Sequence, residues 1–84
     1  MSISTVEAQA LATEVSFTEH EFIVSLVDGR TLSVPLEWFP TLAKASKSQR
    51  SNYELLGDGE GIHWPDLDED ISIDGLLRGD GAKR

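Results

Sequence analysis

The sequence predicts a small α+β domain, built from an antiparallel three-strand meander, a second hairpin and two or three short helices. Three observations predict it. Apolar and polar residues alternate between residues 15 and 34, as in half-buried strands. The dipeptide Asp28-Gly29 interrupts that alternation and favours a tight hairpin turn. Ser46 and Gln49 have the spacing of a helix-capping box. Eighty-four residues make one domain. We expect it to be ordered over residues 11–79, between a flexible arm (1–10) and a disordered tail (80–84).

The meander is the strongest element of this prediction. A first strand surrounds Ser16, and a second strand covers residues 21–27. Asp28-Gly29 is expected to supply the two left-handed residues of a type I′ turn, after which the third strand returns. Side chains two apart in a strand share a face. The expected apolar face comprises Val15, Phe17, Phe22, Val24, Leu26, Leu32 and Val34.

Two short helices should follow the meander. Pro35 ends the third strand, because proline has no N–H to donate to a neighbouring strand. Pro40 suits the first turn of a helix that runs through Ala45. The capping box that begins at Ser46 predicts a second helix over residues 47–52.

A second hairpin completes the predicted core. Its strands cover residues 53–56 and 62–64, and the glycine-rich segment 57–61 turns the chain between them. Ser72 then begins a last short helix that ends at Gly79.

The charge is unevenly distributed along the chain. The net charge is -8, and eight acids lie between Gly57 and Asp80 against a single base, Arg78. This argues against binding nucleic acid through its phosphates, and against binding an anionic membrane surface. A strong negative field instead attracts cationic protein partners.

The sequence also bounds the compartment and the available chemistry. It has no cysteine, which excludes disulfides, thiolate metal sites and thiol catalysis. The first residues lack the basic and apolar regions of a signal peptide, and no apolar stretch approaches the roughly 20 residues of a membrane helix. We therefore expect a cytoplasmic protein.

Residues 61–70 concentrate an imidazole, an indole and four acids in ten positions. Such a run is compatible with a metal site, with a partner-binding surface, or with a solvated acidic turn beside a buried tryptophan. The candidate partner-binding residues are Trp38, His63, Trp64, Asp66, Asp68, Glu69 and Asp70.

Metal binding and catalysis find weaker support in the same residues. A calcium loop that starts at Asp66 needs glycine and glutamate where the chain has Ile71 and Leu77. His63 with Asp66 and Asp68 suits several divalent ions, but it is a single histidine among loop acids. The acids are expected to be equally exposed, so that none is desolvated as a general acid would be. We expect no enzyme, no cofactor and no metal.

The two tryptophans allow two interpretations. In so small a domain, Trp38 and Trp64 are more often core residues than surface residues. If they are half exposed beside the acids, they suit the apolar anchors of a protein interface. A short sheet also leaves an open strand edge, which a partner can extend.

Two blocks of the chain carry a family resemblance. Residues 28–40 (DGRTLSVPLEWFP) and 61–72 (GIHWPDLDEDIS) together resemble an uncharacterised bacterial family, domain of unknown function 2442. The resemblance covers residues 10–79 and implies a β-meander with short helices. It also implies a partner, a small protein of domain of unknown function 4160, in a toxin–antitoxin pair. It implies no catalytic residues. Thr41 departs from the basic residue that is frequent at this position in the family.

The leading hypothesis is therefore a protein-interaction domain, the antitoxin-like partner of a small basic toxin-like protein. One alternative is a metal-binding protein or metal-dependent enzyme that uses His63 and nearby carboxylates. A second alternative is a stand-alone structural domain or one that associates with itself, for example as a homodimer.

Overall fold

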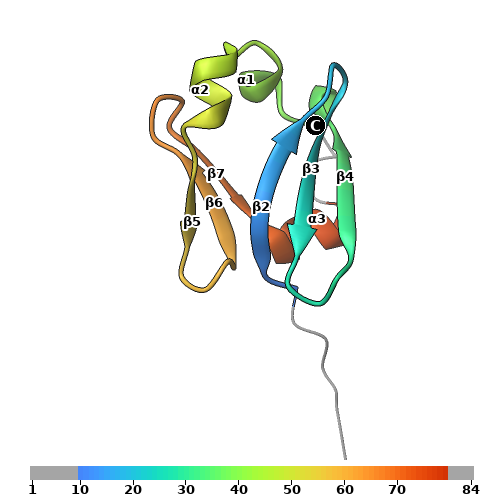
Figure 1. Ribbon diagram of the computed structural model, residues 1–84. Coiled ribbons are helices and arrows are strands. Elements are labelled where there is room, and N and C mark those ends of the chain that lie inside the picture. The colour runs from blue at the N-terminus through green and yellow to red at the C-terminus, as the bar shows by residue number, and fades with distance from the viewer. Residues whose placement is uncertain (1–9, 80–84) are drawn as a thin grey trace, which may run out of the picture.

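The computed structural model describes residues 10–79 and contains two three-stranded antiparallel sheets with short helices (Figure 1). The predicted α+β class is confirmed. The expected arm (1–10) and tail (80–84) fall outside the described residues, apart from Ala10, which packs against the core. The first sheet has the order β2-β3-β4 and the second β5-β6-β7.

The first sheet is the predicted meander. Its strands are β2 (Ala12–Phe17), β3 (Glu21–Leu26) and β4 (Thr31–Pro35). The turn between β3 and β4 differs from the predicted type I′ turn, because only Gly29 has a positive φ, of 96°. The N–H of Gly29 donates to the carbonyl of Leu26, and the N–H of Leu26 donates to the carbonyl of Arg30. This is a three-residue loop closed by a left-handed glycine, so Val27 lies in the loop.

Short helices connect the two sheets. They are η1 (Leu36–Trp38), α1 (Pro40–Ala43) and α2 (Lys47–Ser51). The capping box is confirmed: the Ser46 hydroxyl accepts the N–H of Gln49, and the Gln49 side chain accepts the N–H of Ser46. Arg50 adds a link between α1 and α2, since its guanidinium donates to the carbonyls of Leu42 and Ala43.

The second sheet has one more strand than the predicted hairpin. Its strands are β5 (Glu54–Leu56), β6 (Gly61–Trp64) and β7 (Glu69–Ser72), followed by α3 (Ile73–Arg78). β7 pairs with β6 and places Ile71 opposite Ile62. The predicted ends of α3 are confirmed, with Ser72 as the N-cap and Gly79, at a φ of 76°, as the C-cap.

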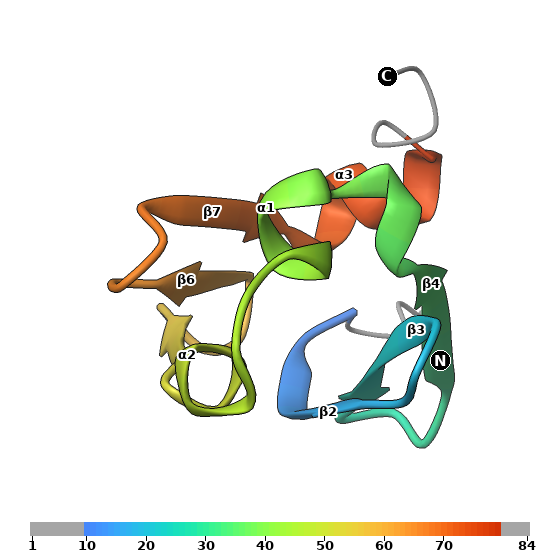
Figure 2. The same ribbon diagram turned by 90° about the horizontal axis from the view of Figure 1, so that it is seen from above.

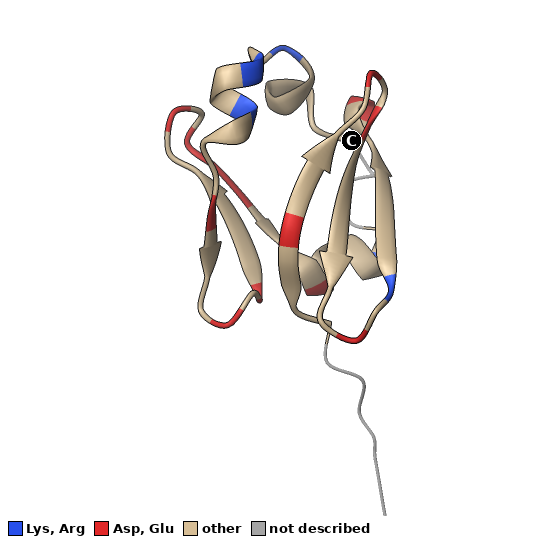
Figure 3. Cartoon of the chain, viewed as in Figure 1, with Lys and Arg blue, Asp and Glu red and all other residues tan. Residues whose placement is uncertain are grey.

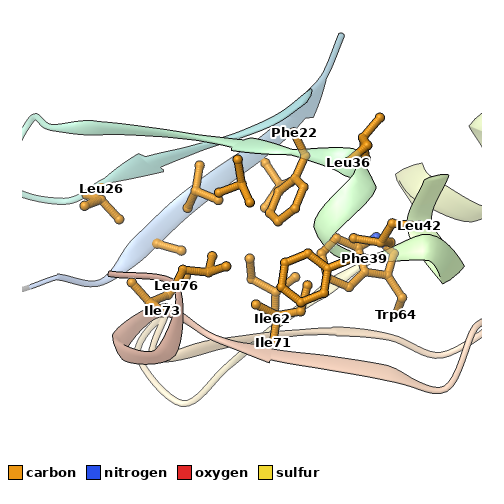
Figure 4. Packing of buried hydrophobic residues seen from close by; sticks show 14 residues of the cluster. Phe22, Leu26, Leu36, Phe39, Leu42, Ile62, Trp64, Ile71, Ile73 and Leu76 are labelled. Atoms are coloured by element: carbon orange, nitrogen blue, oxygen red, sulfur yellow. The ribbon is translucent and has the colours of Figure 1, made fainter. Parts of the chain in front are cut away.

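The core lies between the two sheets. Seen from above, the sheets stand beside one another, and α1 and α3 lie on the side between β7 and β4 (Figure 2). Side chains from β3 point toward side chains from β6, β7 and α3 (Figure 4). The largest fully buried side chains are Trp64, Phe22, Leu42, Ile62, Ile73, Val24 and Val34. Burial of this apolar surface supplies the main stabilising free energy.

On its other side the first sheet meets the second through the edge strand β2. The N–H of Ala12 donates to the carbonyl of Gly59 at 2.8 Å, and the N–H of Val15 donates to the Tyr53 hydroxyl at 3.1 Å. A Cβ at residue 59 would lie 2.3 Å from the Ala12 carbonyl oxygen, so this approach requires glycine.

Candidate protein-interaction surface

The strand geometry of β6 divides the predicted site between two faces of the second sheet. Successive side chains of a strand point to opposite faces. Ile62 and Trp64 therefore point into the core and are fully buried, whereas His63 points outward and keeps 28% of its side chain exposed. Residues 61–70 therefore do not form a single site.

The outer face of this sheet brings three ionisable side chains into one row. Glu54 on β5 pairs in register with His63 on β6, and His63 pairs with Asp70 on β7. Nδ1 of His63 is in hydrogen-bond contact with Oδ1 of Asp70. This hydrogen bond raises the pKa of His63, partial burial opposes the rise, and the charges of Asp70, Glu54 and Asp68 add to it.

The turn between β6 and β7 holds two further acids. Asp66 is exposed and accepts a hydrogen bond from the side-chain amide of Asn52 at 3.1 Å. Asp68 is exposed and has a φ of 52°, which reverses the chain into β7. Short polar side chains tolerate this left-handed conformation better than apolar ones. We define the acidic face as Glu54, His63, Asp66, Asp68 and Asp70.

Glu69 and the two tryptophans do not belong to this surface. Glu69 is half-buried and pairs with Trp64, so it lies on the opposite side of the sheet from His63. Trp38 is half-buried on η1 beside the first sheet, where it packs against the core.

The assignment of Trp64 as an interface anchor is wrong. Its indole is fully buried and lies within 6.4 Å, between ring centroids, of Phe17, Phe22 and Tyr53. Its ring N–H donates to the carbonyl of Arg50 at 3.0 Å, which satisfies the one polar group that the ring carries. The central strand of the sheet directs Trp64 inward, and the core covers it.

Glu54 is the member of the acidic face that the sequence analysis missed. It precedes the glycine-rich turn, outside the run of residues 61–70. Its alignment with His63 follows from the register of β5 on β6. The predicted hairpin, with residues 57–61 in its turn, instead pairs residue 54 with residue 64. The observed turn is one residue shorter, and this shift aligns Glu54 with His63.

Two further observations bound the chemistry of the described residues. Between residues 10 and 79, no three His, Cys, Asp or Glu side chains are arranged to hold a metal ion. Over the same residues, no helix has the length and apolar composition that crossing a membrane requires.

Comparison with known proteins settles the family. Residues 12–82 match the model of a family described as protein of unknown function, DUF2442. The chain belongs to the DUF2442 family. The expected family is thus confirmed. No curated protein matches this chain.

Two solved structures share the DUF2442 fold seen here. One is a crystal structure of a protein of unknown function from Rhodospirillum rubrum, with 34% identity and a TM-score of 0.73, covering 86% of this chain and 89% of that one. The other is a solution structure of an uncharacterised protein from Chromobacterium violaceum, with 25% identity and a TM-score of 0.70. That match covers 82% of this chain and 65% of the other, so this chain spans about two thirds of the second protein.

Proposed function

We propose that this DUF2442 domain binds a small basic protein through the acidic face. The observation that carries the proposal is the row Glu54–His63–Asp70, in which two carboxylates flank one histidine across three strands. The segment from Glu54 to Ser72 contains no lysine or arginine. The charge of this face is therefore left for a cationic partner to neutralise.

Rigid strands make this face a better recognition surface than a mobile acidic loop. The side chains of Glu54, His63 and Asp70 are spaced by the sheet, and Asp66 is held by Asn52. A partner that presents lysine or arginine at matching positions pays little to order these groups. Such charges act mainly on the rate of association and on the choice of partner.

The family resemblance makes the proposal more specific. The resemblance implies one half of a toxin–antitoxin pair, and we extend that role to this chain as an antitoxin-like domain. It would neutralise a basic toxin-like protein by covering the surface with which that protein acts. The proposed role is binding without catalysis.

The proposal is tested with two matched double variants. Glu54→Gln with Asp70→Asn removes two charges from the acidic face, and Glu14→Gln with Glu37→Gln removes two exposed charges from β2 and η1. Association with the product of the adjacent reading frame is measured at low and high salt. We expect the first variant to associate about tenfold more slowly at low salt, with a weaker salt dependence. The control should keep the wild-type rate. Equal association rates for both variants would show that the acidic face does not take part in binding.

A further inference from the structure

A groove runs between the edge of β2 and α2. It has a volume of about 740 Å³, and one wall consists of residues 15–19. Lys47, Arg50 and Tyr53 contribute to the opposite wall. Neighbouring side chains of a strand point to opposite faces, so a groove over one face would be lined by alternate residues. Consecutive lining residues show that this groove follows the backbone edge of β2.

One residue of β2, Phe17, has backbone N–H and C=O groups on this edge that no other residue within 10–79 occupies. The N–H of Thr18 donates to the carbonyl of Glu21, which makes this a hydrogen-bonded pair. Such pairs alternate with non-bonded pairs in an antiparallel ladder. Phe17, opposite Phe22, is thus non-bonded, and its N–H and C=O point away from β3. The N–H of Val15, two residues earlier, points the same way and reaches Tyr53. Within residues 10–79 the Phe17 amide has no partner.

The charge beside this edge is opposite to that of the acidic face. The described part of the chain has five lysines and arginines, and three of them (Lys44, Lys47 and Arg50) lie on the α1–α2 segment (Figure 3). The other two are paired with acids, Arg30 with Asp28 at 2.7 Å and Arg78 with Asp74 at 2.6 Å. Over residues 10–79, Lys47 has no acidic partner.

The two cationic side chains of the groove have different tasks. Arg50 is held by the carbonyls of α1, and its guanidinium lies 5.2 Å from the centre of the Phe17 ring. The Arg50 side chain is therefore a fixed part of the groove wall. Lys47 is exposed and free to meet a ligand. Glu19 lies on the rim, exposed to solvent and 3.7 Å from the ring of His20.

We propose that this groove binds an extended, acidic segment of a protein partner, which pairs with the backbone of Phe17 as an added strand and places a carboxylate beside Lys47. The free edge supplies the hydrogen bonds and the lysine supplies the charge preference, as in other cases of strand addition. The straight part of the edge, Val15 to Phe17, matches about three residues of an extended chain, roughly 10 Å. This site is separate from the acidic face and prefers ligands of the opposite charge.

The probe is a blocked heptapeptide in which glutamate alternates with valine, added to the ¹⁵N-labelled full chain. Binding should shift the amide signals of residues 15–18 and slow hydrogen exchange at the Phe17 amide. The same peptide with lysine in place of glutamate should bind at least about tenfold more weakly. Equal binding of both peptides, no shift at millimolar peptide, or shifts confined to β5–β7 would overturn the proposal.

Two kinds of variant test the contacts without altering the core. Lys47→Glu should weaken binding of the glutamate peptide by about tenfold, whereas Lys44→Glu, which makes the same charge change outside the groove, should weaken it less than about threefold. Alternate residues of the bound peptide direct their N–H groups toward β2. N-methylation of these residues should abolish binding, whereas N-methylation of the residues between them should not. Equal effects within either pair would refute strand addition. So would a concentration-dependent shift of the Phe17 amide without peptide, which would indicate a second copy as the occupant. Unchanged peptide binding by the Glu54→Gln, Asp70→Asn variant separates this test from that of the acidic face.

Discussion

His63 makes the charge of the acidic face depend on pH. Histidine ordinarily titrates near pH 6.5, and the hydrogen bond to Asp70 raises the pKa of His63. When His63 is protonated, it offsets one of the flanking carboxylates. When it loses its proton, the face carries its full negative charge. A basic partner should therefore associate faster as the pH rises through the pKa of His63.

Replacing Asp70 should lower the pKa of His63. Asp70→Asn removes the strongest cause of the rise, whereas Glu69→Gln removes the same charge from a neighbour that does not face His63. We expect an NMR titration of the His63 ring to shift to lower pH only in Asp70→Asn. The raised pKa also stabilises the fold below the pKa of unfolded histidine, and this contribution is lost as the pH rises through the folded pKa. The difference in the free energy of unfolding between the wild type and Asp70→Asn should shrink as the pH rises from the pKa of unfolded histidine through the pKa of folded His63. A difference that does not change with pH would contradict this role of Asp70.

At Gly59, the turn between β5 and β6 is hydrogen-bonded to Ala12 of β2. Gly59→Ala requires a left-handed backbone of φ 107° and places a Cβ against the carbonyl of Ala12. Gly29→Ala is the matched control, since φ is 96° there and nothing lies within 4 Å of the added Cβ. Left-handed strain costs about 1–3 kcal/mol in either case. We expect Gly59→Ala to lower the free energy of unfolding by at least about 2 kcal/mol more, as measured in urea. An equal loss of unfolding free energy in Gly59→Ala and Gly29→Ala would show that the close approach of Gly59 to Ala12 does not require glycine.

At the scale of elements, most local signals were interpreted correctly, whereas the type of the β3–β4 turn and the third strand of the second sheet were not. The capping box at Ser46, the helix ends at Ser72 and Gly79, and the meander all depend on nearby residues, and each is confirmed. β7 was missed because its sequence, EDIS, has one apolar residue and no alternation. Its strand conformation comes from pairing with β6 and from burial of Ile71.

The candidate site was predicted in part for the same reason. The sequence located His63 and the acids within and after the turn, because they are neighbours in the chain. It did not separate the faces of β6, so Trp64 was assigned to the surface. Burial of Trp64 and the alignment of Glu54 with His63 are both set by sheet register. A two-residue period identifies a strand, but the partner strand decides which residue lies opposite.

The capping box of α2 should contribute measurably to stability. Ser46→Ala removes the acceptor of the Gln49 N–H and should lower the free energy of unfolding by about 1 kcal/mol. Ser48→Ala changes an exposed serine in the first turn of the same helix, where no cap is lost. Urea unfolding of both variants gives the comparison. A loss from Ser48→Ala as large as that from Ser46→Ala would contradict the assigned cap.

At the scale of the molecule, charge is sorted between two places. The second sheet and its turns carry acids without a lysine or arginine, and the α1–α2 segment carries Lys44, Lys47 and Arg50 (Figure 3). A net charge of -8 therefore does not describe the whole surface. This separation allows one small domain to prefer a basic partner on one face and an acidic segment at the edge of β2.

Binding through the acidic face is tested most directly by mapping amide shifts on the ¹⁵N-labelled chain as the product of the adjacent reading frame is added. We predict that the perturbed amides cluster on β5, β6, β7 and the turn that holds Asp66 and Asp68. The perturbations should weaken as salt is raised. A folded partner that leaves these amides unchanged, or perturbs only the first sheet, would contradict the claim that the acidic face is the binding surface.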